Sequence, residues 1–361
     1  MKQLILTVLS FSLSILFNFA ANAEVKVIIA ESSYVMGDND SKIDARRIAI
    51  QEAKRKALEI GGTYVESLSQ VKNYQLTKDE IKSYTAGVLE TEIISEQLHG
   101  TMDHPEIYIK AQCKIDTNIV LTQIEKFREN EDIKDQLDAT MKENDELRKE
   151  RDALLTNLAA DKDKTSAAKT RQKLDAVLKK EEANDETNKV WINIGPQLIQ
   201  IDATRQEIKQ ADLDKSAVIL QNSIKVNPQD QRARYLLASI YERKGSTSAA
   251  ETELRTALQH NPSNLTVRMK LGVLLKDQGK YQGALREFHF VERFRPQNAL
   301  MLFYTGMTFK QMGRCGKSVQ YLNRFLINPR INNFPRKKDI AKLAVDDCGG
   351  DRPGRVRRSS Q

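Results

Sequence analysis

Four prolines recur in the C-terminal part of the chain at a nearly constant period. Pro228, Pro262, Pro296 and Pro329 are separated by 34, 34 and 33 residues. The intervals share small residues at 238, 272 and 306, large apolar residues at 241, 275 and 309, and glycine at 245, 279 and 313. A small residue lets two helices approach, glycine suits a tight turn, and proline ends a helix. We therefore predict a repeated unit made of two helices.

On these columns, the segment from about residue 197 to 330 resembles the tetratricopeptide repeat (TPR) family. The resemblance implies an all-α solenoid. Residues 197–228 fit the pattern only in part, because Thr204 stands at the small position and Glu207 replaces the large apolar residue. We expect this segment to be a degenerate first unit. Ile340 and Leu343 indicate a capping helix, so the repeats with their cap are predicted to span residues 191–347.

In this family the first helix of each pair lines a concave face that binds a peptide or a partner protein. The matching positions are Arg232, Tyr235, Ser239, Glu242, Thr266, Met269, Val273, Lys276, Leu300, Phe303, Met307 and Lys310. Tyr235, Met269 and Phe303 are expected to stack as an apolar row. Glu242, Lys276 and Lys310 would form a mainly positive row beside it. A peptide with apolar side chains and an acidic group would suit this groove. The alternative is that these side chains pack on the capping helix or on a neighbouring chain.

The first 23 residues have the composition of a secretory signal peptide. Lys2 supplies a positive start, residues 4–20 are mostly apolar, and Ala21-Asn22-Ala23 is a small-x-small cleavage site. We expect export to the periplasm of a Gram-negative bacterium, with secretion or an uncleaved membrane anchor as alternatives. After cleavage, no segment of the sequence is expected to cross a membrane.

Residues 24–118 are predicted to form a small α+β domain. Apolar residues alternate from Val25 to Ile29, which is typical of a half-buried strand. Alanines at 45, 49, 53 and 57 predict a helix over residues 41–60 that ends at Gly61-Gly62. We expect a strand over 63–72, a short helix over 77–84, and strands over 88–98 and 106–116.

The alanine series, Gly61 after it, and Gly87-Val88 before two strands resemble the N-terminal domain of flagellar assembly proteins of the T type. This resemblance implies a structural or assembly role in a flagellar or secretion apparatus. That role is the alternative to an interaction scaffold in the cell envelope.

Residues 119–190 lack glycine and proline and are rich in charge. Apolar residues at 133, 137, 147, 154 and 158 follow a heptad period. Two interpretations remain open: a parallel coiled coil that joins copies of the chain through residues 119–160, or a single solvated helix that acts as a spacer.

The chain contains three cysteines. Cys113 alternates with apolar residues and is expected to be a reduced core residue. Cys315 and Cys348 are expected to form a disulfide, because the capping helix can fold back over the last repeat; two independent thiols are the alternative.

No motif for catalysis is evident. The sequence has no glycine-rich phosphate loop and no nucleophile elbow, and the four histidines show no metal-ligand spacing. The formal net charge is +8, and we interpret the basic residues as spread along the chain, which argues against a nucleic-acid binder. We expect a non-catalytic protein with no cofactor and no metal, ending in a basic disordered tail over residues 348–361.

Overall fold

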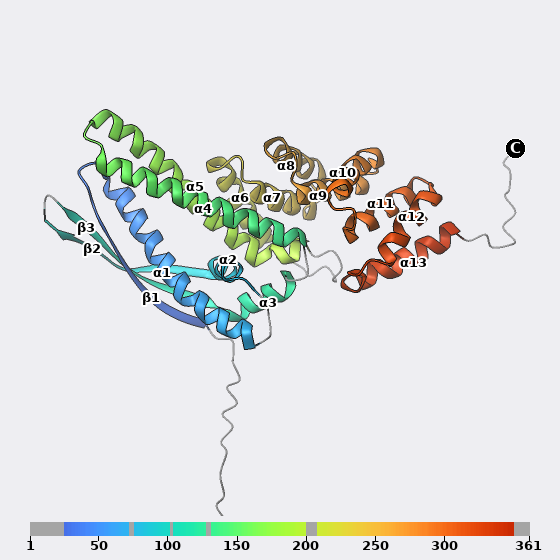
Figure 1. Ribbon diagram of the computed structural model, residues 1–361, viewed down its shortest axis with the longest axis horizontal. Helices are drawn as coiled ribbons and strands as arrows, with labels where there is room; N and C mark the ends of the chain where they lie inside the picture. Colours follow the sequence, from blue (N-terminus) through green and yellow to red (C-terminus); the bar gives the residue numbers. More distant parts are fainter. Residues whose placement is uncertain (1–24, 72–75, 102–103, 128–130, 200–207, 350–361) are drawn as a thin grey trace, which may run out of the picture.

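The structure, a computed structural model, describes residues 25–71, 76–101, 104–127, 131–199 and 208–349. The predicted signal peptide, residues 350–361 of the predicted tail, and Thr204 and Glu207 lie outside the described residues. The described chain forms an α+β head, a long helical hairpin and a curved stack of helix pairs (Figure 1). Its described helices include none that is long and apolar enough to cross a bilayer.

The head contains a three-stranded antiparallel sheet. Its strands are β1 (Val25–Val35), β2 (Leu89–Gly100) and β3 (Pro105–Asp116), in the order β1-β3-β2. Alternate residues of β3, from Ile107 to Ile115, face the helices and are buried. Cys113 is one of them and is a free thiol, as predicted. Burial raises the pKa of this thiol.

Helix α1 (Lys42–Val71) crosses this sheet on the face that β3 buries. The four alanines of the predicted series are fully buried, so the helix lies close to the strands. The helix continues through Gly61-Gly62, and the predicted strand over 63–72 is wrong. At residue 61 the helix passes so near the sheet that a Cβ would lie 2.1 Å from Ile115 Cδ1. Gly61 therefore serves close packing, and this packing outweighs its poor helix propensity of about 1 kcal/mol.

Two short helices complete the head. Helix α2 (Lys78–Val88) begins at a capping box, in which Thr77 and Glu80 each accept the other's backbone N–H. Helix α3 (Thr117–Phe127) follows β3 directly.

Residues 131–199 form an antiparallel hairpin. Helix α4 (Glu131–Ala160) ends at residues 161–163, and α5 (Lys164–Ile199) returns beside it (Figure 1). Leu158 of α4 packs with Leu174 and Leu178 of α5 in one buried cluster, which Leu154 joins. The single solvated helix, one of the two interpretations of residues 119–190, is therefore wrong. Leucines that predicted a coil between chains instead pack within one chain.

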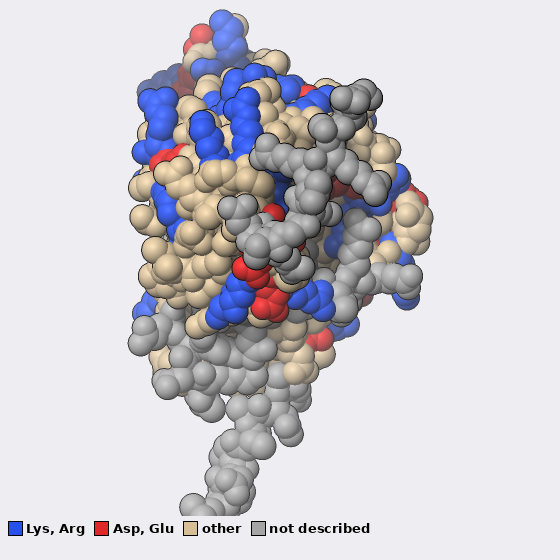
Figure 2. Space-filling model, turned by 90° about the vertical axis from the view of Figure 1, so that its right-hand side faces the viewer, with Lys and Arg blue, Asp and Glu red and all other residues tan. Residues whose placement is uncertain are grey.

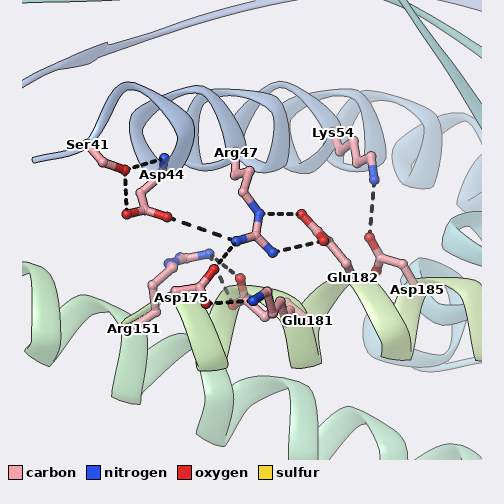
Figure 3. A network of polar contacts seen from close by, with 10 residues as sticks. Ser41, Asp44, Arg47, Lys54, Arg151, Asp175, Glu181, Glu182 and Asp185 are labelled. Atoms are coloured by element: carbon pink, nitrogen blue, oxygen red, sulfur yellow. Dashed lines mark hydrogen bonds and ion pairs between the residues drawn. The ribbon is translucent and has the colours of Figure 1, made fainter. Parts of the chain in front are cut away.

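Charged side chains join this hairpin to α1 (Figure 3). Arg47 donates from Nε and Nη2 to both carboxylate oxygens of Glu182, at 2.8 and 2.9 Å, and from Nη1 to Asp175 at 2.8 Å. Lys54 pairs with Asp185 at 3.3 Å. This fork-to-fork pairing of Arg47 with Glu182 adds geometric specificity to the contact between α1 and α5.

The repeat domain contains three complete helix pairs preceded by one further helix. These helices are α6 (Gln210–Val226), α7 (Gln231–Arg243), α8 (Thr247–His260), α9 (Leu265–Asp277), α10 (Tyr281–Phe294), α11 (Ala299–Gln311) and α12 (Cys315–Leu326). The three predicted turn glycines have φ values of 77°, 74° and 69°. Asp230, Asn264 and Asn298 cap the first helix of each pair by accepting a backbone N–H three residues later. The predicted paired-helix solenoid is confirmed.

The solenoid ends in η1 (Ile331–Asn333) and α13 (Pro335–Gly349). Ala341 and Ala344 of α13 are buried, because this helix packs on α12 and α11. Cys315 and Cys348 form a disulfide with a Cα–Cα distance of 5.0 Å, which is the pairing expected from the sequence. The cap is thus bonded covalently to the last repeat.

Two neighbouring glycines test the close contact of α1 with the sheet. We predict that Gly61→Ala lowers the free energy of unfolding by about 1 kcal/mol, because the added methyl overpacks against Ile115. Gly62→Ala is the matched control: its Cβ would meet nothing nearer than Lys82 Cγ at 3.9 Å, so stability should rise by up to about 1 kcal/mol. Urea denaturation measures both, and equal stabilities would contradict the packing argument.

Two neighbouring arginines test the junction between the head and the hairpin. The Arg47 side chain is 13% exposed, whereas Arg46, which pairs with Glu96, is 46% exposed. We predict that Arg47→Gln lowers the free energy of unfolding by about 2 kcal/mol, because Glu182 loses its cation and Asp175 keeps only Lys179. Arg46→Gln should cost less than about 0.5 kcal/mol. Similar losses in both variants, measured by thermal unfolding, would rule out a special role for Arg47.

Candidate functional site

The first helices of the repeats, α7, α9 and α11, carry the twelve residues predicted to line a partner-binding groove. Seven of the twelve are buried: Arg232, Tyr235, Ser239, Thr266, Met269, Leu300 and Phe303. Five are half-buried: Glu242, Val273, Lys276, Met307 and Lys310. The expected apolar row of Tyr235, Met269 and Phe303 is thus part of the protein interior. What covers it differs at the two ends of the solenoid.

At the first repeat, the hairpin covers the groove. Trp191 of α5 is 1% exposed and lies beside Tyr235 of α7, with ring centroids 6.3 Å apart. Arg232 donates to Asn188 Oδ1 at 2.9 Å and to the backbone oxygen of Asn184 at 3.4 Å. Arg232 and Tyr235 therefore bind the hairpin of their own chain.

A polar junction continues this contact toward the loop before α7. Asn227 donates from Nδ2 to Glu143 Oε1 of α4 at 2.9 Å, and Thr187 Oγ1 donates to Asp230 Oδ2 at 3.3 Å. Burial raises the pKa of Glu143, and the nearby charge of Asp230 raises it further. A cavity of about 440 Å³ opens beside these groups toward the loop before α9. The junction fixes the hairpin on the first repeat by directional contacts.

At the last repeat, the cap covers the groove. Lys337 of α13 is buried, with its Nζ 5.7 Å from the ring centroid of Phe303 and 5.9 Å from that of Tyr304. Phe303 also packs against Phe325 of α12, with ring centroids 5.3 Å apart. At this end of the groove, the side chains therefore pack on the capping helix, which is the alternative given in the sequence analysis.

Between the two covers, the half-buried residues Glu242, Val273, Lys276, Met307 and Lys310 form what we call the concave strip. Its charged side chains are already paired: Glu242 with Lys270, Lys276 with Asp277, and Lys310 with Asp347 at 2.8 Å. The expected positive row is therefore a row of ion pairs. Val273 and Met307 supply the apolar contacts that remain partly accessible.

The basic residues are not spread evenly, contrary to the interpretation of the sequence. Residues 261–361 hold 20 of the 57 Lys and Arg but only 7 of the 49 Asp and Glu. In Figure 2, which views the molecule from the C-terminal side of Figure 1, blue side chains gather on the upper part. Counting charge by segment would have revealed this excess.

Comparison with a family model agrees with the repeat period. Residues 205–265 match the family described as tetratricopeptide repeat. One similar solved structure is YrrB, described as a TPR protein with an unusual peptide-binding site, at 15% identity over 62% of this chain and 97% of that chain, with a TM-score of 0.35. Another is MamA, at 16% identity over 48% of this chain and 97% of that chain, with a TM-score of 0.32. No curated protein matches.

The repeat period, the helix pairs and the family match over residues 205–265 thus agree on repeats of the tetratricopeptide type. Proteins with such repeats are generally non-catalytic modules that bind other proteins.

The polar junction predicts a pH-dependent effect on stability. The raised pKa of Glu143 means that its charged form destabilises the folded state. The stability of the fold is therefore highest below the pKa that Glu143 has in the unfolded chain, and it falls as pH rises through the pKa of the folded state. We predict that Glu143→Gln raises the melting temperature at pH 8 and that this gain vanishes below about pH 4. Glu150→Gln, at an exposed position of the same helix, is the control. A gain that is constant with pH would contradict the assignment.

Proposed function

We propose that this protein is an exported, non-catalytic scaffold whose concave strip binds a partner segment in the bacterial cell envelope. The observation that carries the proposal is the location of the strip. It is the stretch of the concave face that neither the hairpin nor α13 buries completely.

The chemistry of the strip indicates the kind of segment that it binds. Val273 and Met307 offer apolar contact, while Lys276 and Lys310 pair with the exposed carboxylates of Asp277 and Asp347. Exposed ion pairs contribute about 0–1 kcal/mol, so a carboxylate of the partner can replace either one at little cost. An extended peptide with apolar and acidic side chains fits this surface.

The disulfide supports export. Disulfides persist mainly in oxidising compartments, and Cys315–Cys348 joins two elements of the folded repeat domain. This agrees with the predicted signal peptide, and we propose the periplasm as the location.

An assembly role for the head is the second candidate. The sheet leaves Val25, Val27 and Ile29 of the edge strand β1 exposed. Exposed apolar residues along an edge strand favour pairing with another protein. Rings or filaments formed by the purified protein would favour a structural component of a flagellar or secretion apparatus.

Binding at the concave strip can be tested by a pull-down from cell-envelope extract. We predict that the amount of partner recovered falls at least roughly tenfold with the double variant Val273→Ser, Met307→Ser. About 1 kcal/mol of apolar contact is lost at each of the two positions. Val218→Ser, at an exposed position of α6, is the control. Unchanged recovery by the double variant would exclude the strip. Alanine at Tyr235, Met269 and Phe303 would instead test folding, because these side chains are buried.

A further inference from the structure

The edge of the solenoid where one repeat passes to the next carries a second distinctive surface. It consists of Phe290, Arg293 and Phe294 at the end of α10, Ile327 after α12, and the two loops 295–298 and 328–330. We call it the arginine edge. It lies apart from the concave strip, so the inference goes beyond the proposed function.

Arginines of this region stack on aromatic rings and hold a carboxylate at the same time. Arg268 lies 3.7 Å from the ring centroid of Phe290 and pairs with Glu287 at 2.6 Å. Arg324 lies 5.3 Å from the ring centroid of Tyr321 and pairs with Glu292 at 2.7 Å. In both cases the ring orients the planar guanidinium and the carboxylate neutralises it.

Arg293 also lies near aromatic rings, as Arg268 and Arg324 do. Its guanidinium carbon lies 5.9 Å from the ring centroids of both Phe290 and Phe294, whose own centroids are 5.2 Å apart. Arg293 is exposed, and no carboxylate among the described residues pairs with it. The neighbouring carboxylates, Glu287 and Glu292, are held by Arg268 and Arg324. An arginine close to two aromatic rings is therefore exposed to solvent without the carboxylate that Arg268 and Arg324 each hold.

A recess begins two residues after this arginine in the chain. The loops 295–298 and 328–330 border a hollow of about 360 Å³, which is lined by Pro296 and Pro329 together with the polar residues Arg295, Gln297, Asn298, Asn328 and Arg330. Phe294 and Ile327, 58% and 82% exposed, adjoin the two loops in sequence. Large exposed apolar side chains beside a recess are typical of a site that receives an anchoring side chain of a partner.

We propose that the arginine edge docks an acidic segment of a partner protein. A carboxylate of the segment pairs with Arg293, and a neighbouring aliphatic or aromatic side chain enters the recess. The forked geometry of the guanidinium suits a carboxylate. The recess favours a protruding side chain over the flat surface of a bilayer. The excess of positive charge in residues 261–361 attracts an acidic partner from a distance.

The test measures fluorescence anisotropy of a labelled peptide, Asp-Glu-Leu-Phe-Glu-Asp, titrated with the full chain. Saturable binding is expected. The same peptide with Asn and Gln in place of its acids should bind at least roughly tenfold more weakly, because a charge-assisted hydrogen bond is lost. A peptide with two alanines in place of Leu-Phe should also bind more weakly, because the recess remains unfilled.

Protein variants then locate the site. Arg293→Gln and Phe294→Ala should each weaken binding roughly tenfold or more. Arg314→Gln removes the same charge from an exposed position at the opposite edge of the solenoid and should change the affinity less than about twofold. Lys215→Gln, at an exposed position of α6 outside both surfaces, should leave the affinity unchanged.

Three results would overturn the inference. The first is the absence of saturable binding. The second is an equal loss in Arg293→Gln and Arg314→Gln, which would indicate unspecific attraction to positive charge. The third is tighter, Arg293-dependent binding to phosphatidylglycerol vesicles or to single-stranded oligonucleotides than to the peptide, which would assign the surface to a membrane or a nucleic acid.

Discussion

The contact between α5 and α7 connects the two halves of the molecule. On one side, Arg47 and Lys54 hold α5 against the head. On the other, Trp191 and Asn188 of α5 hold Tyr235 and Arg232 of the first repeat. Since α5 has both contacts on a single helix, the head and the solenoid are placed relative to one another by one rigid element. The proposed surfaces for partners depend on this placement, because the same hairpin covers the first part of the concave face.

The polar content of this contact has a physical consequence. Burying charged groups such as Glu143 and Arg232 costs desolvation free energy, and an apolar interface of the same area would be at least as stable. Directional hydrogen bonds from Asn227 to Glu143 and from Arg232 to Asn188 fit only one register of the hairpin on the repeat. We interpret the junction as a device that selects this register. The apolar contact of Trp191 with Tyr235 supplies stability beside it.

Local conformational requirements were the part of this structure that could be predicted from the sequence. The glycines at 245, 279 and 313 adopt positive φ in every repeat, and the period of the prolines marks the loops between repeats correctly.

Gly61 misled the prediction because glycine also serves close packing inside a helix, and only the position of Ile115 distinguishes the two uses. Leu154 and Leu158 stand on the heptad pattern and pack inside the hairpin, but a heptad pattern does not state which helix it meets. For the same reason Tyr235 and Phe303 stand at groove positions of the repeat and are nevertheless buried, because segments remote in sequence cover them. The charge excess of residues 261–361 was present in the sequence but was hidden by averaging over the whole chain.

One part of the solenoid binds its own chain, and we propose that two other parts bind partners. Trp191 is the only tryptophan in the sequence, and it lies in the contact between the hairpin and the first repeat. Its fluorescence emission and its quenching by acrylamide therefore report directly on whether the hairpin is docked. We predict blue-shifted emission and weak quenching in the native chain, both lost on unfolding. Emission at the wavelength of a water-exposed indole, quenched as strongly in the native chain as in urea, would show that the hairpin does not cover the first repeat.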